Sequence, residues 1–248
     1  MIYELKDTSK AQDLFRFTED SLVLSCLQHV MGRIYVTDPC MPRSAMAVLA
    51  DFVYFAGEPD RELAEGVPED GWILVPPDER WTGLIKACWP DAEEYTRYAI
   101  RKDTEFDMEN LRSIAASLPA GYGIRKIDSE IYGMCLEEPL FEDCVKHFGS
   151  EERYFELGRG MAVMKDGRPV SVCSSYTSFR DGIEIEVDTL EEERRKGLAA
   201  AVSASLILSC LDDGLYPSWD AANPASVHLA EKLGYEFSHE YHCYAISR

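Results

Sequence analysis

One stretch, residues 183–199, constrains the fold more than any other part of the chain. Its first six residues alternate between apolar and acidic side chains, which is the period-2 pattern of a β-strand. Three glutamates and three cations follow. The next run, from Leu198 to about Leu211, is apolar nearly all round and predicts a buried helix. The stretch therefore predicts a strand, a charged loop and a helix, in that order.

The loop between strand and helix has the residues of an anion-binding site. Arg194-x-x-Gly197-x-Ala199 brings a cation and small residues to the start of the helix. Backbone N–H groups at a helix N-terminus are unpaired and have a partial positive charge, so they suit a phosphate. The alternative interpretation is a solvated helix start with internal ion pairs. The preceding strand and the spacing of the small residues favour phosphate binding.

This pattern resembles motif A of the GNAT superfamily of N-acetyltransferases, in which an arginine or glutamine, then x-x-Gly-x-Gly/Ala, holds the pyrophosphate of acetyl-coenzyme A. A second match follows. Residues 223–235, Asn-Pro-Ala-Ser-Val-His-Leu-Ala-Glu-Lys-Leu-Gly-Tyr, resemble motif B of the same family. The resemblance covers residues 122–248. The two-part layout is also similar to a bacterial GNAT branch that includes the zwittermicin A resistance acetyltransferase.

The resemblance implies an α/β (α+β) fold with a mixed, mostly antiparallel central sheet flanked by helices. A Pro- and Gly-containing break at residues 118–123 predicts a domain boundary. Residues 1–120 would form a smaller α/β N-terminal domain, and residues 121–248 the GNAT domain. The first half alternates strands and helices without a coenzyme motif, and a degenerate copy of the same fold is one interpretation. Within it, the apolar run Ala45–Phe55 predicts a single central strand.

The resemblance also implies acetyl-coenzyme A as a co-substrate and no metal. Backbone groups of the strand would bind the pantetheine arm, the loop would bind the pyrophosphate, and the motif B helix would contact the arm. Asn223 also suits a helix N-cap, with Pro224 at the first helical position, and both roles can hold together. The predicted coenzyme-binding residues are Val187, Thr189, Arg194, Arg195, Lys196, Gly197, Leu198, Ala199, Asn223 and Ser226.

The polar face of the predicted strand, with Glu184, Glu186 and Asp188, supplies candidate general bases. Acetyl transfer needs a neutral amine, and carboxylates crowded on one face repel each other, which raises the pKa of at least one of them. Glu186 is the first choice and Glu184 the second. The alternative is the solvent face of a two-sided strand.

The usual general acid of motif B is missing. By resemblance, many relatives have a tyrosine where this chain has Ala230. Tyr235 and Tyr176 are the substitutes that the sequence offers. Arg195 is a second departure, because many relatives have a glycine at that position.

Composition limits the partners. The formal net charge of −20 argues against nucleic acid or an anionic membrane, and favours a cationic amine as acceptor. Eight scattered cysteines and an N-terminus without an apolar run predict a cytoplasmic protein. His239-x-x-His242-Cys243 matches no standard zinc spacing, so no metal site is predicted. The oligomeric state stays open, with a homodimer as one option.

The sequence therefore predicts an acetyl-coenzyme A dependent N-acetyltransferase, of the EC 2.3.1 type, that acts on a primary amine of a small molecule or peptide by direct attack. A catalytically weak or inactive coenzyme A-binding regulatory protein is the alternative, which the missing motif B tyrosine favours. An acyl donor longer than acetyl is a third interpretation.

Overall fold

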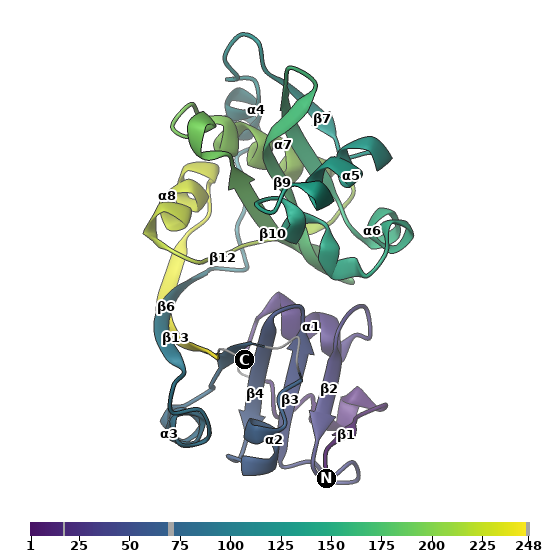
Figure 1. Cartoon of the computed structure of the whole chain (residues 1–248), viewed down its shortest axis with the longest axis vertical. Coiled ribbons are helices and arrows are strands. Elements are labelled where there is room, and N and C mark those ends of the chain that lie inside the picture. The colour runs from purple at the N-terminus through teal and green to yellow at the C-terminus, as the bar shows by residue number, and fades with distance from the viewer. Residues whose placement is uncertain (17, 69–71, 247–248) are drawn as a thin grey trace. The chain divides into compact units, whose positions relative to one another are not determined.

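The chain divides into two compact units in a computed structural model that describes residues 1–16, 18–68 and 72–246 (Figure 1). The first unit is Met1–Arg97 with Glu240–Arg248, and the second is Tyr98–His239. Two strands, β6 (Glu93–Ile100) and β13 (Phe237–Ala245), contribute residues to both units. No helix in the described part of the chain is both long and apolar enough to span a bilayer.

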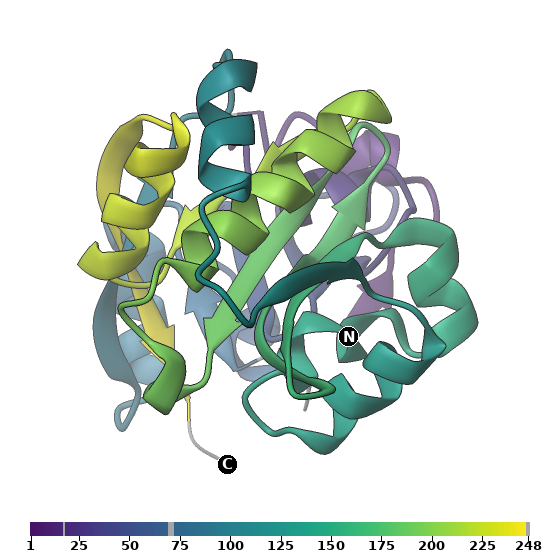
Figure 2. The same cartoon turned by 90° about the horizontal axis from the view of Figure 1, so that it is seen from above.

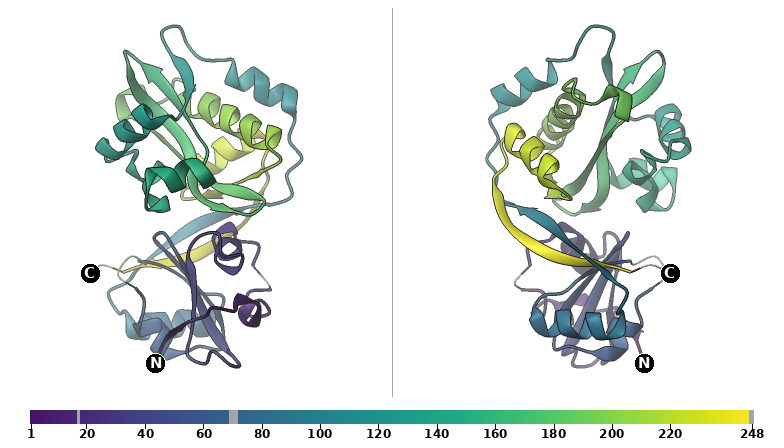
Figure 3. Two further views of the ribbon diagram at one scale, coloured as in Figure 1. Left: turned by 90° about the vertical axis from the view of Figure 1, so that its right-hand side faces the viewer. Right: turned by 60° about the vertical axis from the view of Figure 1, so that its left-hand side comes forward.

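The first unit is built on one sheet. Its other elements are β1 (Tyr3–Glu4), η1 (Thr8–Ala11), α1 (Ser21–Leu27), β2 (Arg33–Val36), β3 (Ser44–Leu49), β4 (Phe52–Gly57), α2 (Arg61–Glu65), β5 (Ile73–Val75) and α3 (Glu79–Cys88). The strands pair in the order β1-β2-β3-β4-β5-β13, and all of these pairs are antiparallel except β4–β5. α1 lies against β2 and β3. Figure 3 shows α3 lying along the sheet, where the Trp81 ring stacks on Phe55 with centroids 4.6 Å apart.

The prediction of a single strand over Ala45–Phe55 is wrong. This run forms the hairpin of β3 and β4, in which Leu49 pairs with Phe52. Ala50 turns the chain with a φ of 51°, in the left-handed region that apolar side chains rarely adopt. Nearly every residue of both strands is buried, so neither strand alternates, and within residues 45–55 Asp51 alone interrupts the apolar run at the turn.

The second unit contains the predicted strand–loop–helix stretch. Its elements are α4 (Met108–Ala115), β7 (Gly123–Lys126), α5 (Ser129–Glu137), η2 (Glu142–Cys144), η3 (Lys146–Phe148), α6 (Glu151–Leu157), β8 (Gly160–Lys165), β9 (Arg168–Phe179), β10 (Gly182–Thr189), η4 (Glu191–Glu193), α7 (Leu198–Asp212), β11 (Tyr216–Ser218), β12 (Asp220–Ala221) and α8 (Pro224–Leu233). The sheet order is β11-β10-β9-β8-β7, antiparallel except for the parallel β10–β11 pair. β12 pairs with β6. The predicted fold class, a mixed and mostly antiparallel sheet flanked by helices, is confirmed.

Helices cover both faces of this sheet (Figure 2). Ile183 and Ile185 point into a core that α7 and α4 close, whereas η2 and α5 lie against the other face. Ile100 and Leu111 are buried in the same core as α7. The compact unit therefore begins at Tyr98, and the predicted boundary at residues 120/121 falls on a turn between α4 and β7 inside it.

Gly182 is required where β10 and β11 approach each other. A Cβ atom built there would lie 2.1 Å from the backbone oxygen of Tyr216. Gly182→Ala should therefore reduce the free energy of unfolding by about 1–3 kcal/mol, as overpacking does. Gly133→Ala is the matched control, because nothing lies within 4 Å of its Cβ position in α5 and it should stabilise the chain. Urea unfolding measures both variants. Equal stabilities would contradict this packing.

Candidate functional site

The two edges of β10 are paired differently. β9 pairs with β10 along its whole length, but β11 pairs with it only over Gly182–Glu184. Beyond Glu184, β10 has no strand partner on that side within the described part of the chain, since β12 pairs with β6. Val187 and Thr189 lie on this second half of the strand. Backbone groups along a strand edge without a ladder can pair with an extended ligand.

A β-bulge marks the point where the pairing changes. The register with β9 shifts between Glu184 and Ile185, so Tyr176 of β9 has no opposite residue. Bulges bend a strand and change the direction of its side chains. Tyr176 itself is buried and packs edge-on against His147, with ring centroids 4.3 Å apart.

The loop after β10 ends at an open helix N-terminus. Gly197 is the N-cap of α7, has a φ of 81° and provides no side-chain cap. The first backbone bond of the helix runs from Ala201 N to Gly197 O, at 3.1 Å. Nothing lies within 4 Å of the Cβ position of Gly197. The N–H groups of Leu198 and Ala199 thus belong to the first turn of a long helix with space in front of its N-cap.

The three predicted loop cations have different surroundings. Arg194 donates from Nε to the carbonyl of Thr189, 3.2 Å away. Lys196 donates to Glu193 Oε2 at 2.6 Å. Arg195 is exposed and has a φ of 64°, a backbone conformation that glycine adopts without strain.

Glu193 holds this loop to the rest of the unit. Its side chain is only 4% exposed and accepts hydrogen bonds from Lys165 Nζ at 2.6 Å, Lys196 Nζ at 2.6 Å and Tyr122 Oη at 2.5 Å. Three hydrogen bonds lower the pKa of Glu193 to about 2, with the largest effect from Lys165, followed by Lys196 and Tyr122. The sequence interpretation missed this contact. The one signal for it in the sequence was the i, i+3 spacing of Glu193 and Lys196. The loop thus has an internal ion pair and also a helix N-terminus without a side-chain cap.

The motif B helix begins as predicted. Asn223 Oδ1 accepts a hydrogen bond from Ser226 N at 3.0 Å, which confirms the N-cap, and Pro224 is the first helical residue. The Ser226 hydroxyl accepts from Trp219 Nε1 at 3.1 Å. Ala230 is fully buried. Tyr235 is also buried and donates its hydroxyl to the Pro217 carbonyl at 2.5 Å.

Burial raises the pKa of Tyr235 well above its usual value. A phenol that is buried and already donating to a carbonyl is a poor proton donor to a ligand. Neither Ala230 nor Tyr235 therefore supplies an accessible acid at the motif B helix.

The three acids of β10 differ in exposure. Glu184 is buried and its Oε2 lies 3.8 Å from Lys102 Nζ, whereas Glu186 and Asp188 are partly exposed. Burial, together with the charge of Asp143, raises the pKa of Asp188 to about 6, and Arg194 offsets part of this rise. A carboxyl group that titrates near neutral pH has the property needed for general base catalysis.

A comparison with known families identifies the family of the chain. The family described as GNAT acetyltransferase matches residues 12–244. The chain belongs to the GNAT acetyltransferase family. The uncharacterized N-acetyltransferase YdfB of Bacillus subtilis is 26% identical to it over 232 residues, which are 88% of this chain and 86% of that protein.

Solved structures of other GNAT proteins have the same fold. A GCN5-related N-acetyltransferase-like protein from Streptococcus suis is similar over 97% of this chain and 98% of its own, with a TM-score of 0.92 and 40% identity. A tandem GNAT protein from the clavulanic acid biosynthesis pathway is similar in fold, with a TM-score of 0.56 at 12% identity over 98% of both chains.

The raised pKa of Asp188 has a consequence for stability. Because its pKa in the folded chain lies above the ordinary 3.8, the ionised form costs stability above about pH 6, and this cost disappears as the pH falls toward 4. Asp188→Asn should raise the free energy of unfolding at pH 8 by on the order of 1 kcal/mol, after allowance for solvent screening, and should change it little at pH 4. Thermal unfolding at both pH values measures this. Asp181→Asn, in the exposed turn before β10, is the control, and a less stable Asp188→Asn protein at pH 8 would contradict the assignment.

Proposed function

We propose that this protein transfers an acetyl group from acetyl-coenzyme A to a primary amine by direct attack of the amine. The observation that supports this most is the continuity between the unpaired edge of β10 and the open N-terminus of α7. An extended thioester arm fits the first feature and a pyrophosphate fits the second. Family membership supports the reaction class.

In this proposal the coenzyme follows the chain from strand to helix. Backbone groups of Val187 and Thr189 bind the pantetheine arm, and a backbone N–H near Val187 stabilises the developing oxyanion. The N–H groups of Gly197, Leu198 and Ala199 bind the pyrophosphate. Arg194, Arg195 and Lys196 add positive charge around it, and Asn223 and Ser226 lie beside the arm at the start of α8.

The acid face of β10 would remove the proton of the amine. Glu186 and Asp188 are two residues apart on this face and both are partly exposed, so a proton can leave through either one, directly or through water. Asp188 adds a pKa of about 6, which suits a base at neutral pH. The net charge of −20 raises the local concentration of cationic amines, on a small molecule or a peptide.

A coenzyme A-binding protein with little turnover is the second candidate. It is favoured by the buried Ala230 at the usual tyrosine position and by the engaged hydroxyl of Tyr235. Consumption of acetyl-coenzyme A in the presence of amines distinguishes the two candidate functions. Both bind coenzyme A, but the second consumes no acetyl-coenzyme A with any amine.

A carboxylate at position 197 should abolish coenzyme binding. In Gly197→Glu, a side chain and a negative charge would enter the space in front of α7, where the pyrophosphate is proposed to bind. Gly214→Glu is the matched control, because Gly214 also has a left-handed φ, 73° against 81°, and open space around its Cβ position. Calorimetry with coenzyme A measures both folded variants. Wild-type affinity in Gly197→Glu would refute the site.

The rate of acetyl transfer should rise with pH through an apparent pKa near 6, as Asp188 loses its proton. Asp188→Asn should remove this rise of the rate with pH.

Glu186→Gln should lower kcat more than it raises KM, because loss of a general base lowers the rate ~10²–10⁴-fold. The assay is acetyl-coenzyme A consumption over aminoglycosides, polyamines and short peptides, followed by pH profiles with the best acceptor. If both variants keep the wild-type profile, the base lies elsewhere.

A further inference from the structure

Lys102 lies far from motif A in the sequence but meets it in the fold. It follows β6, and its ammonium donates to Ser218 Oγ at 2.8 Å and to the Trp219 carbonyl at 2.9 Å. Glu184 Oε2 is 3.8 Å from the same ammonium. The Lys102 side chain is 20% exposed and that of Glu184 is 7% exposed, so this ion pair is largely withdrawn from water.

These partners share one place in the sheet. Glu184 and Ser218 are the last register pair of the parallel β10–β11 ladder, and Trp219 is the next residue. Trp219 is 2% exposed, and the ladder that would have paired its backbone has ended. A buried carbonyl without a donor costs free energy, so the donor that replaces the ladder matters. Lys102 is that donor.

Glu184 completes the arrangement by supplying charge. An ammonium removed from water needs a nearby negative charge, and the Glu184 carboxylate 3.8 Å away supplies one. Its burial also separates it from Glu186 and Asp188, which are partly exposed on the same strand. This gives Glu184 a different role from the proton transfer that the sequence suggests.

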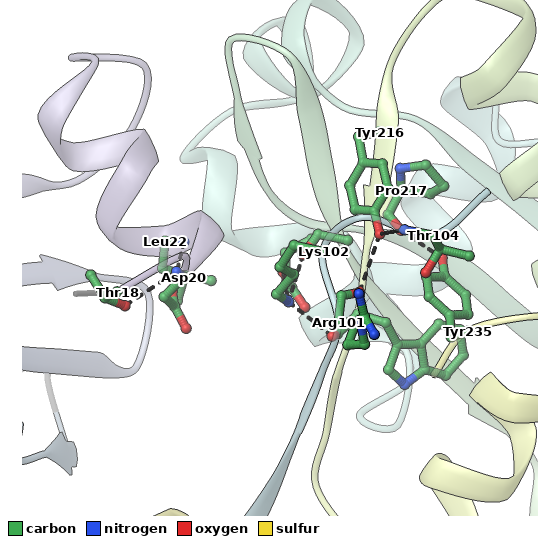
Figure 4. A network of polar contacts seen from close by, with 12 residues as sticks. Thr18, Asp20, Leu22, Arg101, Lys102, Thr104, Tyr216, Pro217 and Tyr235 are labelled. Carbon is green, nitrogen blue, oxygen red and sulfur yellow. Dashed lines mark hydrogen bonds and ion pairs between the residues drawn. The ribbon is translucent and has the colours of Figure 1, made fainter. Parts of the chain in front are cut away.

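The backbone that presents Lys102 is itself held on β11. The Tyr216 hydroxyl donates to the Arg101 carbonyl at 3.3 Å and accepts from Thr104 N at 3.4 Å (Figure 4). The Arg101 side chain forms ion pairs with Asp103 at 2.6 Å and Glu236 at 3.2 Å. The segment on both sides of Lys102 is thus fixed to the strand whose end it caps.

We propose that Lys102 and Glu184 are positioning residues that fix the point where β11 leaves β10. They hold open the strand edge along which the pantetheine arm binds. This inference rests on the proposed function, because it concerns the same coenzyme site. Binding of the pantetheine arm, and not binding of the phosphates, should depend on Lys102 and Glu184.

The experiment compares two probes by calorimetry: coenzyme A, and adenosine 3′-phosphate 5′-diphosphate, which keeps the pyrophosphate and lacks the pantetheine arm. Lys102→Met should weaken coenzyme A binding about tenfold or more, since its loss leaves Trp219 without its donor, and should leave binding of the adenosine nucleotide unchanged. Lys102→Arg should recover most of the coenzyme A affinity, because a guanidinium can donate to the same oxygens. Lys126→Met, at an exposed position of β7, is the matched control and should bind both probes as the wild type does.

The double variant Lys102→Met/Glu184→Gln separates positioning from charge compensation. It should have a higher Tm than Lys102→Met, because a neutral amide replaces the buried carboxylate that has lost its ammonium partner. Its coenzyme A affinity should stay weak, because Trp219 still lacks the donor. Wild-type coenzyme A affinity in Lys102→Met, equal loss for both probes, or full recovery of affinity in the double variant would each overturn the inference. A wild-type protein that binds neither probe would instead refute the proposed coenzyme site.

Discussion

The site depends on where one parallel strand pair ends. β10 and β11 share a ladder over Gly182–Glu184, and the rest of β10 keeps a partner on one side only within the described residues. If the ladder continued, the backbone of the second half of β10 would be used inside the sheet and could not bind anything else. The close approach at Gly182, the bulge after Glu184 and the donor at Lys102 all act on this short segment.

The loop after β10 combines local strain with strong anchoring. Arg195 has a left-handed backbone that costs an L-residue about 1–2 kcal/mol, and Gly197 adopts the same region without that cost. Glu193, buried and held by Lys165, Lys196 and Tyr122, opposes this strain from within the same loop. A strained segment persists where its surroundings over-determine it, and such segments are common at binding sites. The charge of Lys196 is paired with Glu193, so Arg194, Arg195 and the backbone N–H groups of α7 are the groups of this loop that would attract an anion.

Local patterns in the sequence predicted the central elements well. The alternation of Ile183, Ile185 and Val187 predicted β10, the apolar run after Gly197 predicted α7, and Asn223-Pro224 predicted the start of α8. Each of these signals lies within a few residues of the element that it specifies, so a single sequence is enough to read it.

Non-local features could not be predicted in the same way. No local pattern in the sequence identifies Lys102 as important. Its partners Glu184, Ser218 and Trp219 are all more than eighty residues away in the sequence. The raised pKa of Asp188 depends on burial and on Asp143, which only the fold brings near it. The hairpin inside Ala45–Phe55 was missed for a different reason, since two fully buried strands have no polar face to show their period.

The first unit is discontinuous in the chain, and this affects the order in which the protein can be completed during synthesis. β13 pairs with β5 through Tyr244 and Ala245, and Tyr244 is buried in the core of that unit. The ribosome makes these residues after every residue of the second unit. Until β13 is made, the first unit therefore has an open sheet edge at β5, whereas the second unit, which interrupts it in the chain, can fold first. A chain cut before Tyr244 would lose part of the core of its first unit and keep the loop after β10.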